Sequence, residues 1–98
     1  MIEESQIKRI RRHIDRIDTV IITALAERFS LIPEIAEYKK QHNLPIFDED
    51  RELQIMAKLK DIAKAQGLDE GFVEEVFLSV FNEAKRIQNE LINGKQAN

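Results

Sequence analysis

A single apolar stripe along the first 40 residues limits what this chain can fold into. Its members recur at alternating spacings of three and four, which is typical of a helix packed along its length against another helix. The stripe consists of Ile7, Ile10, Ile14, Ile17, Ile21, Ala24, Leu31, Ile35 and Tyr38. A helix over residues 4–40 would be about 55 Å long, well over the diameter of a domain this small. Shorter helices of the same chain cannot cover it, so either the helix breaks or a second chain covers the rest. We predict a second chain.

The remainder of the chain predicts two more helices and no strand. Residues 49–65 form the second helix, with Asp48 placed to cap it and Gly67 placed to end it. Asp69 caps a third helix, whose apolar stripe comprises Val73, Val76, Phe77, Val80, Phe81, Ala84, Ile87 and Leu91. We therefore expect an all-α fold of three helices with a long first helix, in a single domain over residues 1–98.

Pro33 lies inside the predicted first helix. Proline lacks a backbone donor and clashes with the carbonyl four residues earlier, here that of Phe29, at a cost of about 3 kcal/mol. We expect a bend near residues 29–33, not a chain reversal, because the apolar stripe continues past the proline in register.

Composition narrows the functional classes. No apolar run approaches the roughly 20 residues of a membrane span, and the acidic start (MIEE) does not predict a signal peptide. Cysteine is absent, which removes disulfides and thiolate metal sites and fits a cytoplasmic protein. The formal charge of −3 indicates no general affinity for nucleic acid or membranes. His13 and His42 have no partners at metal-ligand spacing, so we expect both on the surface and no metal site. No cofactor is expected.

Polar side chains interrupt the apolar stripes. Continuing the seven-residue count from Ile21 reaches Arg28, and Lys39 lies eleven residues further on, within about 20° of the same helix face. Gln88 falls on the stripe of the third helix, where a buried amide needs hydrogen-bond partners. Glu52 lies on the inner side of the second helix. These positions suit a sheltered polar site, although carboxylate pairing, solvent exposure or a helix-dipole role would explain each residue alone.

Arg11 lies beside the first stripe, about 25 Å along the helix from Arg28. Both cannot reach one small ligand from one straight helix, but an antiparallel pair of long helices would bring Arg11 of one chain near Arg28 of the other. A solvated basic patch explains Arg11 equally well by itself. The chain has no zinc motif, catalytic triad, phosphate loop or helix-turn-helix pattern. Converging cations and an amide instead suit a small polyanion and a reaction that needs charge stabilisation.

Five sequence features together resemble the all-helical chorismate mutases, in matching order over essentially the whole chain. They are residues 10–18 (IRRHIDRID), 25–28 (LAER), 36–39 (AEYK), 45–52 (PIFDEDRE) and the late Gln88. The resemblance implies an intertwined helical homodimer that converts chorismate to prephenate in phenylalanine and tyrosine biosynthesis. It is closest to the short, stand-alone bacterial enzymes and implies no cofactor.

The same resemblance implies a role for each site residue. Arg28, and Arg11 from the partner chain, would bind the two carboxylates of the substrate. Lys39 would contact a carboxylate and the ether oxygen, and Gln88 would donate to that same oxygen. Glu52 and Asp48 would hold the ring hydroxyl, and Arg51 would support the anion-binding end.

Two departures and two alternatives accompany this resemblance. Family members commonly carry a hydroxyl residue at the substrate-binding position that is Ala84 here, and Pro33 is a second departure. An isochorismate pyruvate lyase, which makes salicylate, would share the Arg, Arg, Lys and Gln set, although residues 48–52 favour the mutase. A non-catalytic helical dimer that serves as a binding or regulatory module is the alternative from a different functional class.

Overall fold

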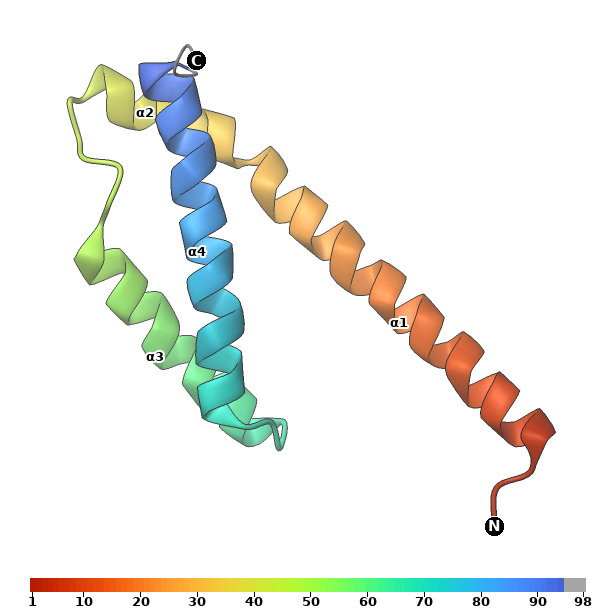
Figure 1. The fold of residues 1–98 in the computed structure, drawn as a ribbon. Coiled ribbons are helices and arrows are strands. Elements are labelled where there is room, and N and C mark those ends of the chain that lie inside the picture. Colours follow the sequence, from red (N-terminus) through yellow and green to blue (C-terminus); the bar gives the residue numbers. More distant parts are fainter. Residues whose placement is uncertain (95–98) are drawn as a thin grey trace. The chain divides into compact units, whose positions relative to one another are not determined.

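The protein is all-α, as predicted. The computed structural model describes residues 1–94, and within them it contains helices and no strand (Figure 1). The helices are α1 (Glu4–Ser30), α2 (Ile32–Gln41), α3 (Glu49–Ala65) and α4 (Glu70–Asn93). The helix predicted over residues 4–40 is therefore present as α1 and α2, and the other two predicted helices correspond to α3 and α4.

A single residue, Leu31, separates α1 from α2. Its N–H bonds to the carbonyl of Arg28 at 3.3 Å, three residues back, which tightens the last turn of α1. Pro33 is the second residue of α2, in the first turn, where a missing N–H costs nothing. The same missing donor leaves Phe29 without the bond that would continue α1. The helix is thus interrupted at Leu31, within the range 29–33 where a bend was predicted.

As predicted, the side chains of two aspartates cap the N-termini of α3 and α4. Asp48 accepts a hydrogen bond from the backbone N–H of Arg51 at 3.1 Å, and Asp69 accepts one from that of Phe72 at 2.8 Å. Each bond satisfies a backbone donor that the first turn of a helix leaves unpaired. Between α3 and α4 the chain turns at Gly67, whose φ of 74° lies in the left-handed region that favours glycine.

The chain divides into two compact units, residues 1–31 and residues 32–98. In the second unit, α2 and α3 both pack against α4, which runs back alongside α3 (Figure 1). The interior of this unit is formed by apolar side chains that α4 shares with the other two helices. Its buried apolar residues are Ile32, Ala36, Met56, Ala63, Val73, Val80, Phe81 and Ala84.

The first unit is α1 with its flanking residues, and no residue of α1 is buried. Four isoleucines of the predicted stripe, Ile10, Ile14, Ile17 and Ile21, are between 39% and 52% exposed. No helix within residues 1–94 is both long enough and apolar enough to cross a membrane.

Candidate functional site

Lys39 lies in the last turn of α2 and is half-buried. The chain then folds back on it: the N–H of Leu44 bonds to the carbonyl of Lys39 at 2.8 Å, and Asn43 takes a left-handed φ of 52°. The Lys39 ammonium donates to the carbonyl of Ile46 at 2.7 Å. These bonds hold residues 42–48, the loop between α2 and α3, against the end of α2.

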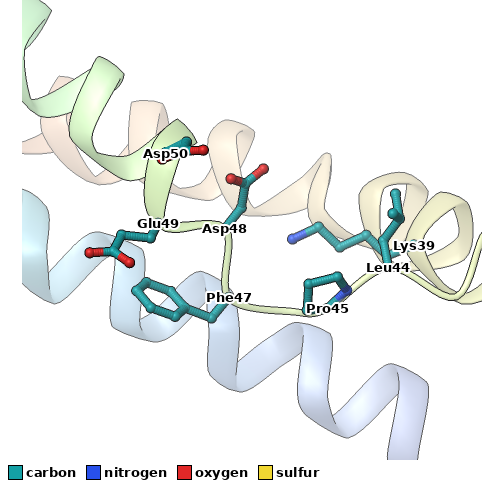
Figure 2. Close-up of a pocket in the computed structure, with 7 residues that line it drawn as sticks. All are labelled: Lys39, Leu44, Pro45, Phe47, Asp48, Glu49 and Asp50. Carbon is teal, nitrogen blue, oxygen red and sulfur yellow. The ribbon is translucent and has the colours of Figure 1, made fainter.

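A cavity of about 370 Å³ opens between this loop and the start of α3. Figure 2 shows the Lys39 side chain extending along the loop with its ammonium directed toward Asp48. The lining includes three carboxylate residues and one lysine; its residues are Lys39, Leu44, Pro45, Phe47, Asp48, Glu49 and Asp50. By itself, such an acidic rim would repel a dianion.

Two opposing effects act on the pKa of Lys39. Burial disfavours the ammonium and lowers its pKa below the ordinary lysine value, while the nearby carboxylates of Asp48 and Glu52 oppose part of that shift. The net direction is downward. Lys39 is therefore a cation that is held partly out of water beside two of the predicted site residues.

Glu52 lies in the first turn of α3 and is half-buried, on the same side as the buried Met56. Its Oε2 accepts from the ammonium of Lys85 on α4 at 2.9 Å. The same ammonium lies 4.5 Å from the centroid of the Phe47 ring. Lys85 therefore connects α4 to both α3 and the loop, and Glu52 has a fixed charge partner in addition to its place near the helix N-terminus.

Gln88 is buried on α4, only 5% exposed. Its Oε1 is sheltered from solvent and has no hydrogen-bond partner among the described residues. A buried amide left unsatisfied costs about 1–3 kcal/mol. One turn earlier, the buried Ala84 offers no polar side chain.

The remaining predicted residues differ in exposure. Asp48 is exposed and caps α3 through its Oδ1, and Arg51 is exposed in the first turn of the same helix. Arg11 is exposed on α1, and Arg28 is half-buried in the last turn of α1. The second unit thus contains Lys39, Asp48, Arg51, Glu52, Ala84 and Gln88, whereas Arg11 and Arg28 belong to the first.

Two residues of this region were not singled out from the sequence. Phe47 lines the cavity, and Lys85 neutralises Glu52. The only sequence signal for Lys85 is a lysine directly after the apolar Ala84 and three residues before Gln88. Within residues 1–94, no group of three His, Cys, Asp or Glu side chains could hold a metal ion.

The chain is similar to known proteins over most of its length. The family model for chorismate mutase type II matches residues 10–89. A chorismate mutase of Methanocaldococcus jannaschii is 33% identical over 87 residues, covering 89% of this chain and 88% of that protein. A 4-amino-4-deoxychorismate mutase of Streptomyces venezuelae is 26% identical over 89 residues, covering 91% of this chain and 86% of the relative.

Longer proteins contain a similar segment. A bifunctional chorismate mutase/prephenate dehydratase of Buchnera aphidicola is 34% identical over 83 residues, which are 85% of this chain but only 22% of that protein. The chain thus spans most of its shorter relatives and under a quarter of this one. No solved structure shows a significant match.

The unpaired oxygen of Gln88 leads to a prediction about the stability of the protein. Gln88→Met keeps an unbranched side chain but removes the unsatisfied amide, so the unliganded protein should gain about 1 kcal/mol in its free energy of unfolding. Urea denaturation at one fixed protein concentration measures the change. Asn82→Met, at an exposed position of the same helix, is the control and should leave stability nearly unchanged. A loss of stability in Gln88→Met would mean that the amide has a structural partner.

Proposed function

Because the chain belongs to the type II chorismate mutase family, we propose that it rearranges chorismate to prephenate at a site that two copies of the chain build together. The protein is an isomerase of the chorismate mutase class. The observation that carries the proposed site is a pair of sheltered polar groups, Lys39 and Gln88, on helices that pack together. The absence of cysteine supports the cytoplasm as its compartment.

The charge of the loop region supports a site that needs further cations. Chorismate carries two carboxylates, yet the residues that line the cavity include Lys39 as their single cation, together with Asp48, Glu49 and Asp50. A dianion binds there only if other elements supply positive charge. In our proposal Arg28 and the partner chain's copy of Arg11 do so, each pairing with one substrate carboxylate through the planar fork that suits bidentate binding.

The exposed stripe of α1 supports the dimer. Large apolar side chains that a single chain leaves half-exposed at helical spacing form a surface for another helix. Two copies of α1 packed in antiparallel orientation would cover the isoleucines of both chains. The same packing would bring Arg11 of one chain to the end of α1 that carries Arg28 in the other, about 25 Å away along a single helix.

The chemistry requires positioning and charge stabilisation, and no nucleophile. In the rearrangement one carbon–oxygen bond breaks while one carbon–carbon bond forms within the same molecule, and negative charge grows on the ether oxygen. The arginines hold the compact conformer in which the reacting carbons meet. Lys39 and the amide of Gln88 donate to the ether oxygen, and each such sheltered donor typically contributes about 3–4 kcal/mol to the transition state.

In this proposal α3 and the loop that precedes it bind the ring end of the substrate. Glu52 and Asp48 accept from the ring hydroxyl in this proposal, and Arg51 supports the anion-binding end. Ala84 lines the site without donating, so the substrate has one bond fewer there than a hydroxyl side chain would offer, which weakens binding by about 1.5–3 kcal/mol. The side chains of Glu52 and Asp48 place two carboxylates beside the ring hydroxyl, which is neutral, and not beside a carboxylate of the substrate.

The direct test follows the loss of chorismate absorbance with the purified protein. Lys39→Met should lower kcat by about 100- to 1,000-fold because it removes the donor to the ether oxygen. Lys40→Met, at the exposed neighbouring position, is the matched control and should keep wild-type kcat. Circular dichroism checks that both variants remain helical.

Two outcomes would contradict the proposal. Equal activity in the wild type and in folded Lys39→Met would remove Lys39 from the chemistry. A parallel assay with isochorismate that yields salicylate, combined with poor turnover of chorismate, would instead assign the lyase reaction.

The pH dependence follows from the charge of Lys39. The lysine acts as a cation, so kcat/KM should fall as pH rises through its pKa, which burial sets below the ordinary lysine value. Between mildly acidic and neutral pH the profile should be flat, because the Gln88 amide does not titrate. In Lys39→Arg, whatever activity remains should persist to higher pH because arginine stays protonated. A steep acidic optimum in the wild type would contradict these roles.

A further inference from the structure

Lys85 on α4 is a cation that joins α3 and the loop before it, next to the proposed site residues. Its ammonium meets Glu52 of α3 at 2.9 Å and the face of the Phe47 ring at 4.5 Å. The two charged side chains are 27% and 22% exposed, so this ion pair is more sheltered than those of Lys8, Lys60 and Arg86. An ion pair shielded in this way is screened less by salt and solvent than one at the surface.

The pair changes what Glu52 offers to a ligand. A carboxylate that already accepts from an ammonium can still accept from a hydroxyl through its remaining lone pairs. It has little net attraction for a second cation, because Lys85 offsets its charge. Phe47 lies against the same ammonium, so a cation–π contact also favours keeping Lys85 in this position.

Lys85 is the cation paired directly with Glu52, while the carboxylates of Asp48 and Glu52 both act on Lys39. Removing Lys85 would leave Glu52 without its paired ammonium. An unpaired carboxylate would attract an ammonium group on a substrate more strongly than the paired carboxylate does.

We propose that Lys85 sets substrate specificity by neutralising Glu52, so that the site favours a ring bearing a hydroxyl over a ring bearing an ammonium. The inference rests on the proposed function, in which Glu52 faces that ring substituent. The two substrate types are chorismate and its analogue 4-amino-4-deoxychorismate, after which relatives of this chain are named. Lys85 is a positioning residue here, because it acts through Glu52 and not on the reacting atoms.

The test compares kcat/KM for the two substrates in the full-length protein. The wild type should prefer chorismate. Lys85→Met keeps the apolar stem but removes the charge, and it should raise the ratio of amino-substrate to chorismate kcat/KM by about tenfold. Lys85→Gln should shift the ratio in the same direction, which gives a second neutral variant if the first folds poorly.

Two variants separate specificity from structure. Lys85→Arg keeps the charge beside Glu52 and should hold the ratio within about threefold of wild type. Lys60→Met removes another lysine–glutamate pair between α3 and α4, that of Lys60 with Glu74. It should leave the ratio unchanged, although its free energy of unfolding can fall.

Different results would contradict the specificity role of Lys85 and the proposed function. If the wild type turns over chorismate but both neutral Lys85 variants keep the wild-type ratio, or lose both activities equally, the specificity role is wrong and the proposed function stands. If the folded wild type acts on neither substrate, the proposed function is wrong and the role of Lys85 is wrong with it.

Discussion

The apolar stripe of α1 is the constraint on which the proposed molecule depends. Its isoleucines remain about half-exposed in a single chain, so burying the rest of each one would contribute roughly half of the 1.5–3 kcal/mol of a whole side chain. The other helices pack around α4, and in our proposal the gain comes from a second copy of the chain. In the proposed dimer the packing that covers the stripe also brings Arg11 of the partner to the site. Stability and substrate binding would therefore depend on the same contact.

The second unit shows the opposite relation between stability and function. Gln88 is buried with an unpaired oxygen, and burial lowers the pKa of Lys39 against the pull of nearby carboxylates. Both features cost free energy, and both place a polar group where water is excluded.

Local signals in the sequence predict most of the fold. Asp48 and Asp69 mark the starts of α3 and α4 because their side chains cap backbone donors, and Gly67 marks a left-handed turn. Pro33 predicts the interruption at Leu31 through its missing N–H. These effects depend on residues within one helical turn of each other, so periodicity and residue type are sufficient to find them.

The site is harder to predict from the sequence than the fold is, because it depends on which side chains face each other across helices. The pairing of Lys85 with Glu52 follows from how α4 lies against α3, and no spacing within either helix specifies it. The loop cavity beside Lys39 likewise arises from a backbone that folds back on α2. The position of Arg28 on α1 follows from the seven-residue count, and Arg11 lies beside the same stripe. Their roles as substrate ligands stay a prediction, because they require a second chain.

Subunit complementation tests most directly whether two chains share one site. Chains carrying Arg11→Ala and Lys39→Ala are co-assembled, each being inactive by itself. In the proposed arrangement half of the dimers are mixed and one of their two sites is intact, so about a quarter of wild-type activity should return. Chains carrying Arg28→Ala and Lys39→Ala serve as the control and should recover none, because both residues come from the same chain. Activity no higher than that of the two separate variants in the first mixture would contradict a site shared between chains.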